Sequence, residues 1–220
     1  MIRFIELFAG IGGFRYGLES IGVQKKQGGE ANKEEEHEGW SGLHSLSKED
    51  SRSTVRRANE LPDGITYERQ FNCVYSNEWD EYANSVYRRH YGECDNRDIT
   101  TVRASELPDF DLLTGGVPCQ AWSLAGKRGG FGDERGNLWF EFFRILKEKQ
   151  PKYFIAENVK GILSSNKGRA FEEICEHLCE CGYAIDFDVL NSKDFGVPQN
   201  RERVFIVGVR LDLLDECQVF

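Results

Sequence analysis

The sequence lacks any long hydrophobic run, and this absence argues against a membrane-spanning helix. No apolar stretch in the 220 residues approaches the ~20 that a span requires. The N-terminal MIRFIELF carries Glu6 inside a very short apolar run, so it does not have the layout of a signal peptide. With 40% hydrophobic and 30% charged residues, the composition is typical of a soluble globular protein, and we expect a cytoplasmic location.

Regular cysteine spacing is also missing. The chain has seven cysteines, an odd number without a repeating interval, which disfavours a disulfide framework and fits reduced thiols in a cytosolic compartment. Cys175, Cys179 and Cys181 lie close together, but their spacing is not that of a tetrahedral zinc site. Cys175 and Cys181 fall on one apolar helical face, so we predict packing there and no metal.

An excess of positive charge is absent as well. There are 28 Lys and Arg against 37 Asp and Glu, for a net charge of -9 at pH 7. This balance excludes a nucleic-acid footprint over the whole surface but allows a local basic groove.

The chain is organised around residues 110–123. The apolar run 110–114 predicts a buried strand of a parallel sheet, which Gly115 and Gly116 end. Pro118 stiffens the backbone directly before Cys119, which places one thiol at the carboxyl end of a central strand, where open α/β sheets hold their chemistry. A buried structural cysteine is the alternative, but a cysteine after proline in a Gly-flanked loop is poorly placed for a core.

A glycine turn follows the first predicted strand. Residues 2–8 form that strand, residues 9–13 a tight turn, and residues 14–21 a helix, the order with which α/β folds bind a nucleotide-like cofactor. The turn is not G-x-G-x-x-G, because position 15 is Arg. A dinucleotide enzyme, a methyl-donor enzyme and a plain β–α turn are all open at this point.

A second predicted strand, residues 71–76, ends in candidate cofactor contacts. Glu78 can accept hydrogen bonds from a ribose diol, and Trp79 can stack on an adenine. The alternatives are a solvated carboxylate and a core aromatic ring. Asp98 can accept from an adenine amine or cap a turn. Between the first helix and this strand, residues 24–70 are polar and aperiodic, and we predict a flexible insertion within a single domain, 1–220.

Beyond the central cysteine, residues 123–132 are glycine-rich and locally basic, which predicts a mobile lid that contacts phosphates. Residues 137–149 predict a helix with Leu138, Phe142, Ile145 and Leu146 in the core. The next strand, 152–156, leads into Glu157, and Arg201 and Arg203 enter the last strand. A carboxylate at the end of the neighbouring strand can face the thiol.

Four motifs occur in order along these elements: Phe8–Gly13 (FAGIGG), Gly116–Gln120 (GVPCQ), Glu157–Val159 (ENV) and Gln199–Arg203 (QNRER). Each motif alone is weak, but the ordered set is highly specific. The chain resembles the DNA cytosine-5 methyltransferases of bacterial restriction-modification systems. This resemblance implies a Rossmann-like S-adenosylmethionine-dependent methyltransferase fold, with a mostly parallel sheet, helices on both faces and an antiparallel last strand.

The resemblance also implies roles. Cys119 is the nucleophile that adds to carbon 6 of a flipped-out cytosine, Glu157 holds or protonates ring N3, and Arg203 with Arg201 binds the O2 side. S-adenosylmethionine is the methyl donor and double-stranded DNA the substrate. The implied cofactor contacts are Phe8, Gly10, Ile11, Gly12, Gly13, Glu78, Trp79, Asp98, Ile99, Pro118 and Leu138. The implied DNA-contacting loop residues are Gln120, Ser123, Lys127 and Arg128.

One departure from the family concerns length. The family continues into a target-recognition domain and a C-terminal helix, whereas this sequence stops at Phe220. We therefore expect weak or no activity from the chain alone and a complementary polypeptide that supplies those parts.

Other functions stay open. A tRNA cytosine-5 methyltransferase carries the same motifs. A non-catalytic, cofactor-binding regulatory subunit is a further alternative, against which intact Cys119, Glu157 and Arg203 weigh. A nicotinamide dehydrogenase is disfavoured, because the glycine turn lacks its third glycine and Cys119 has no role in it.

Overall fold

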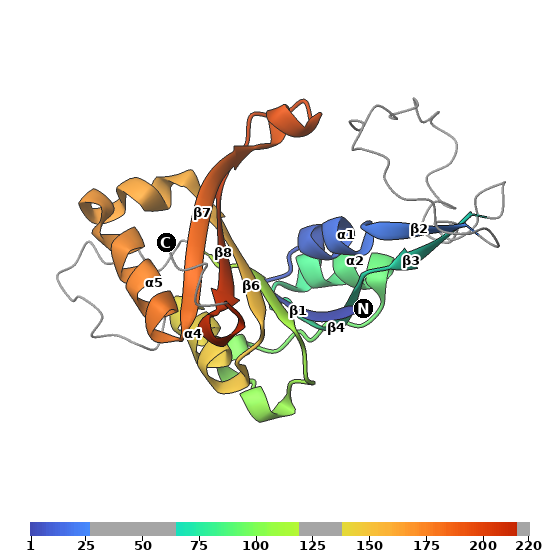
Figure 1. Cartoon of the computed structure of the whole chain (residues 1–220), viewed down its shortest axis with the longest axis horizontal. Coiled ribbons are helices and arrows are strands. Elements are labelled where there is room, and N and C mark those ends of the chain that lie inside the picture. The colour runs from blue at the N-terminus through green and yellow to red at the C-terminus, as the bar shows by residue number, and fades with distance from the viewer. Residues whose placement is uncertain (27–64, 119–137, 215–220) are drawn as a thin grey trace.

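The computed structural model describes residues 1–26, 65–118 and 138–214 (Figure 1). Its main sheet has six strands in the order β4-β1-β5-β6-β8-β7. Their bounds are β1 Ile2–Leu7, β4 Phe71–Asn77, β5 Leu112–Gly116, β6 Tyr153–Val159, β7 Tyr183–Asn191 and β8 Glu202–Arg210. The α-helices are α1 Gly13–Glu19, α2 Glu81–Tyr91, α4 Leu138–Lys149 and α5 Arg169–Glu180, and short 3-10 turns include η2 Ile99–Thr101 and η7 Ser192–Phe195.

The strand directions confirm the predicted fold class. β1 runs parallel to β4 and β5, and β5 runs parallel to β6. β8 is antiparallel to both of its neighbours, β6 and β7. The sheet is therefore mostly parallel, and the reversed strand is the last one in the chain.

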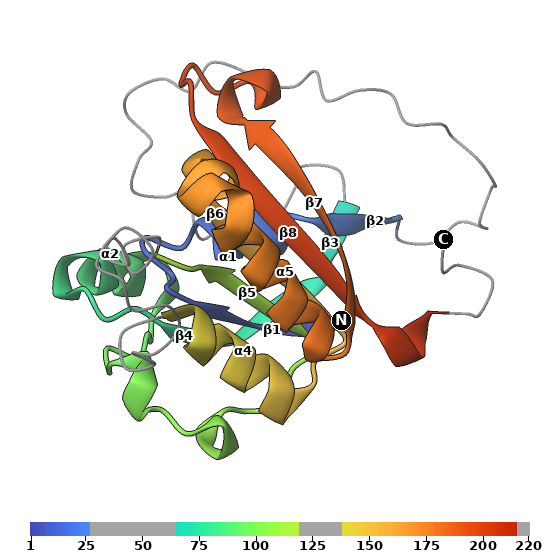
Figure 2. The same cartoon turned by 90° about the vertical axis from the view of Figure 1, so that its left-hand side faces the viewer.

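Helices lie on both faces of the sheet. α4 and α5 cover the face that carries the main core (Figures 1 and 2), and Phe142 and Leu146 of α4 belong to the same buried cluster as Ile5 and Leu7 of β1. Successive side chains of a strand point to opposite faces. Glu6, which bonds to α2, therefore places α2 and the neighbouring α1 on the other face.

The predicted core of α4 is largely confirmed. Phe142, Ile145 and Leu146 are fully buried, whereas Leu138 is half-buried at the first position of the helix and packs against the core. In α5, Cys175 is half-buried, and Cys181, which caps the helix, is buried. Among the described residues, no group of three or more His, Cys, Asp or Glu side chains is placed to hold a metal ion.

The predicted insertion begins and ends in ordered structure. Gly22–Lys26 (β2) and Ile65–Arg69 (β3) form a two-stranded antiparallel sheet that projects from the domain (Figure 1). Lys26 and Ile65 are register partners at its far end. Residues 27–64 lie outside the described residues.

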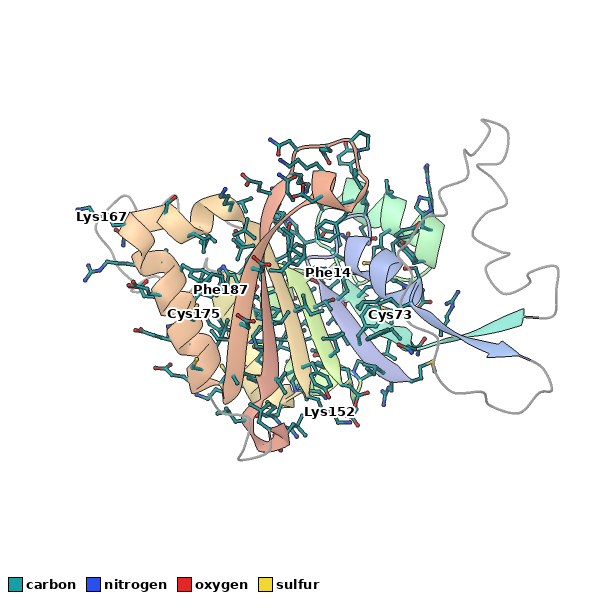
Figure 3. The ribbon with its side chains drawn as sticks, turned by 45° about the horizontal axis from the view of Figure 1, so that its top comes forward. Phe14, Cys73, Lys152, Lys167, Cys175 and Phe187 are labelled. Carbon is teal, nitrogen blue, oxygen red and sulfur yellow. The ribbon has the colours of Figure 1, made fainter. Side chains whose placement is uncertain are left out.

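An apolar hollow of about 290 Å³ lies at the amino ends of the strands. It is bordered by Leu18 of α1 and by strand residues on the face away from the main core, including Val207, 43% exposed, and Tyr153, 39% exposed. Figure 3 looks onto the strands with α5 on the left and α1 on the right. Lys152, labelled at the bottom of the sheet, lies at the amino end of β6 and marks the edge where the hollow lies. The helices in the described part of the chain fall short of what a membrane span requires in length or apolar character.

Candidate functional site at the carboxyl ends of the strands

The glycine turn after β1 has a left-handed backbone, a conformation that favours glycine. Phe8, Gly10 and Gly12 all have positive φ, at 54°, 56° and 91°. At Gly12 an added Cβ would clash with the ring of Tyr91, so a side chain there would displace that ring as well as strain the backbone. Ile11 is 66% exposed, so the turn presents itself to solvent. The predicted cofactor turn is therefore formed as a tight, exposed loop that leads into α1.

The carboxylate of Glu78 joins this turn to the start of α2. Its Oε2 accepts a hydrogen bond from the Gly10 N–H at 2.7 Å, and its Oε1 accepts one from the Asp80 N–H at 2.8 Å. Glu78 is 9% exposed. A carboxylate has about four acceptor positions, and the hydrogen bonds with described residues occupy two of them. The alternative of a simply solvated carboxylate is wrong.

Trp79 lies beside this carboxylate and is 70% exposed, which rules out the alternative of a core aromatic ring. The Glu78 N–H donates to the Asp95 carbonyl at 2.9 Å, which joins Glu78 to the loop at residues 94–97. Asp98 directly follows this loop. The Asp98 carboxylate accepts from the Thr100 N–H at 3.0 Å and thus caps η2, with Ile99 buried behind it. The structure brings together the glycine turn, Glu78 and the loop to Asp98.

A second cluster lies on β6 and β8. The Arg203 Nε lies 2.9 Å from Glu157 Oε1, and each side chain is 22% exposed. A Cβ built on Gly116 would lie 3.6 Å from the other oxygen, Glu157 Oε2, so the carboxylate lies over the end of β5. Glu157 and Arg203, two predicted catalytic residues that are distant in sequence, are thus paired. Glu157 lies beside Gly116, which precedes Pro118 by two residues. Arg201 is exposed, and its backbone N–H donates to Asn191 Oδ1 at 3.1 Å.

Asn158 connects the ends of β5 and β6, a contact that the sequence does not reveal. Its Nδ2 donates to the Val117 carbonyl at 2.9 Å, and its Oδ1 accepts from the Val159 N–H at 2.8 Å. The side chain is buried, at 3% exposure. Asn158 therefore fixes the backbone immediately before Pro118. The signal in the sequence is a polar amide directly after Glu157 in an otherwise apolar strand.

The predicted nucleophile and the DNA-contacting loop cannot be placed. Cys119, Gln120, Ser123, Lys127 and Arg128 lie outside the described residues, as Pro118 is the last described position before the gap.

A buried acid on β1 is a further feature that sequence reasoning missed. Glu6 is fully buried, and burial raises its pKa to about 7, against the opposing effect of hydrogen bonds from the Tyr87 hydroxyl and from the backbone of Arg15 and Phe14. The Tyr87 hydroxyl lies 3.1 Å from Glu6 Oε2 and accepts from Arg15 Nη1 at 3.3 Å. The break that Glu6 makes in an apolar run is its only signal in the sequence.

Comparisons with known proteins identify the family to which the chain is similar. The model of the family described as C-5 cytosine-specific DNA methylase matches residues 61–218. The chain is 38% identical over 212 residues to the Type II methyltransferase M.HhaI of Haemophilus parahaemolyticus, which covers 96% of this chain and 50% of that protein. It is 37% identical over 212 residues to the Type II methyltransferase M.BsuFI of Bacillus subtilis, covering 96% and 40%.

Among solved structures, the S. pombe Dnmt2 methyltransferase superimposes with a TM-score of 0.62 at 22% identity, covering 96% of this chain and 51% of that one. This likeness shows a shared fold. The chain spans about half the length, or less, of these curated relatives.

Proposed function

The chain belongs to the family of C-5 cytosine-specific DNA methylases, and we propose that it is the catalytic half of a DNA cytosine-5 methyltransferase. The observation that carries the proposal is the Glu157–Arg203 pair at 2.9 Å, held over the end of the strand that leads into Pro118 and Cys119. The description of the matching family, C-5 cytosine-specific DNA methylase, favours DNA over tRNA as the substrate.

The cofactor of this function is S-adenosylmethionine, which supplies an electrophilic methyl group when bound. The residues present fit it. Glu78 offers spare acceptor capacity to a ribose diol, the exposed Trp79 offers a face to the adenine, and the glycine turn admits close approach of the ligand to its backbone. Phe8 and Pro118 lie just beyond the carboxyl ends of β1 and β5, and Ile99 and Leu138 complete the proposed contacts.

Cys119 acts as the nucleophile. Its thiolate would add to carbon 6 of the cytosine, which makes carbon 5 nucleophilic. Carbon 5 would take the methyl group from bound S-adenosylmethionine, which leaves as the thioether S-adenosylhomocysteine. Transfer of the carbon 5 proton to water and elimination of the Cys119 thiolate would then restore the aromatic ring. A cysteine suits this role because the thiolate is a soft nucleophile that adds and leaves again.

Glu157 and Arg203 stabilise the charge that develops on the ring. Arg203 engages Oε1 of Glu157 and so orients the carboxyl group, while Oε2, on the side of Gly116, is the atom that contacts N3. Arg203, with Arg201, binds the O2 side of the base. Because a base inside a duplex is out of reach, the cytosine is flipped out, and the residues Gln120, Ser123, Lys127 and Arg128 hold the DNA.

Base flipping costs a few kcal/mol. We assign the contacts that offset this cost to the part of the relatives that the present chain does not cover. That part is carried either on the same polypeptide or on a complementary one. The apolar hollow bordered by Leu18, Tyr153 and Val207 supports a partner segment, because such surface is more stable when covered.

The test is covalent trapping on duplex DNA that contains 5-fluorocytosine. The chain is incubated with S-adenosylmethionine, alone and together with the polypeptide that carries the rest of the fold. We expect a covalent complex with the rest of the fold present, little or none without it, and none with Cys119→Ser. Trapping by Cys119→Ser would overturn the assigned nucleophile, and preferential trapping on tRNA would overturn the assigned substrate.

A further inference from the structure

Three asparagine side chains fasten the Glu78–Trp79 turn to the loop at residues 94–97. They are Asn77 at the end of β4, Asn84 in α2 and Asn96 in the loop. Asn77 and Asn84 are buried, at 2% and 3% exposure, whereas Asn96 is exposed. None of them belongs to the motifs that identify the family.

Asn96 has the most direct contacts with the turn. Its Nδ2 donates to the Glu78 carbonyl at 2.9 Å and to the Trp79 carbonyl at 2.9 Å. From the other side, Asn84 Nδ2 donates to the same Glu78 carbonyl at 2.9 Å. Both carbonyls of the turn are therefore held by side-chain amides.

Asn77 ties the other end of the loop. Its Nδ2 donates to the Asp95 carbonyl at 3.2 Å and to the Arg97 carbonyl at 2.9 Å. The residue after Arg97 is Asp98. The amides thus connect two segments that the proposed function places on the same ligand.

Trp79 needs such support because it is 70% exposed and packing does not fix it. Ordering a mobile side chain and its backbone on binding costs free energy that a preorganised site avoids. We infer that Asn96, assisted by Asn84 and Asn77, is a positioning residue that holds the Glu78–Trp79 backbone ready for the adenosine part of the methyl donor. This inference rests on the proposed function.

The residue type matters at position 96. A carboxamide nitrogen has two N–H donors, and Asn96 directs both to carbonyl oxygens. An aspartate at this position has the same shape but no donor when ionised, and its charge repels both carbonyls. Asn96→Asp therefore removes the contact while leaving the volume unchanged.

The experiment compares Asn96→Ala and Asn96→Asp with Asn72→Ala, a matched change at another exposed asparagine, on β4. The first readout is amide hydrogen exchange in the ligand-free chain. We expect faster exchange of the Asp80 and Gly10 N–H groups, which bond to the Glu78 carboxylate, in both Asn96 variants and no change in Asn72→Ala.

The second readout is calorimetric affinity for adenosine and for S-adenosylhomocysteine. Losing the two hydrogen bonds should weaken both ligands about tenfold, with unchanged affinity in Asn72→Ala. Unchanged exchange, or unchanged affinity despite faster exchange, would overturn the inference. If the unmodified chain binds neither ligand, the proposed cofactor is wrong, and the exchange data still decide whether Asn96 holds the turn.

Discussion

At the carboxyl ends of the strands, the carboxylates of Glu78 and Glu157 are held in different ways. At the β1–β4 end, Glu78 is 9% exposed and bound by two backbone N–H groups. At the β6–β8 end, the partner of Glu157 among the described residues is the side chain of Arg203, and both are 22% exposed. The first carboxylate is fixed by the fold, whereas the second is fixed by a partner that can move.

From this difference we infer that the Glu78 region binds the cofactor and the Glu157 region acts on the base. Backbone donors cannot change place without unfolding the turn, which suits a pocket that is formed before its ligand arrives. A partly exposed ion pair contributes only about 0–1 kcal/mol to stability, so the value of the Glu157–Arg203 pair lies in contacts with an incoming base. We therefore expect cofactor binding by the chain alone and base chemistry only in the complete enzyme.

Glu157→Gln should give the largest effect. The amide keeps the shape but loses the acid–base function, and methyl transfer by the assembled enzyme should fall about 10²- to 10⁴-fold. The matched control is Glu202→Gln on β8, where Glu202 pairs with the exposed Lys160 at 2.8 Å. Affinity for S-adenosylhomocysteine should stay unchanged in both variants. Near-normal turnover of Glu157→Gln would remove this residue from the chemistry.

Glu6→Gln should change how stability depends on pH. The pKa of Glu6 rises from 4.5 to about 7 on burial, so the folded protein retains a proton that the unfolded chain loses between these values. The contribution of Glu6 to the free energy of unfolding is fully present below pH 4.5. It is lost as the pH rises through 7, by up to about 3 kcal/mol.

Urea unfolding of the unmodified chain and of Glu6→Gln, at pH 5 and pH 8, measures this loss. The variant should lose less stability over this range than the unmodified chain. Parallel losses in the two proteins would show that Glu6 titrates normally in the folded state.

Arg203→Ala should reduce methyl transfer about 10- to 100-fold, because a hydrogen bond to a charged group contributes roughly 1.5–3 kcal/mol. Arg203→Lys keeps the charge but not the planar fork of donors and should recover only part of the rate. Arg201→Ala, at an exposed position, should have a smaller effect. An equal loss in the Arg201 and Arg203 variants would contradict the assignment of Arg203 as the main contact.

Replacing residues 27–64 should have the smallest effect. Lys26 and Ile65 are register partners, so a two-residue Asn-Gly turn can close the β2–β3 ribbon. We expect affinity for S-adenosylhomocysteine to stay within about twofold. A loss greater than tenfold, about 1.4 kcal/mol, would show that the segment contributes to the pocket.

The sequence predicted the order of the main strands and helices because apolar runs and glycine turns are local features. It also predicted that Glu157 lies at the same sheet edge as the end of β5, since neighbouring parallel strands end at the same edge, and the structure places its carboxylate beside Gly116. It could not decide between an exposed and a buried Trp79, because exposure depends on what packs from elsewhere. The β2–β3 ribbon was missed because Gly22–Lys26 is polar, without the alternation of a half-buried strand.

The amide contacts of Asn84, Asn96 and Asn158 were missed for a related reason. Each joins a side chain to a backbone carbonyl on a different element, and only the folded geometry brings these atoms within 3 Å. Likewise, an acid in the first strand, Glu6, was visible in the sequence, but its burial against Tyr87 was not.

Calorimetric titration of the 220-residue chain alone with S-adenosylhomocysteine measures whether the cofactor pocket forms without the rest of the fold. We expect saturable binding at one site, weakened about tenfold or more by Glu78→Gln and unchanged by Glu157→Gln. Absence of binding, or equal weakening by both substitutions, would contradict a cofactor pocket that is formed independently of the base-binding cluster.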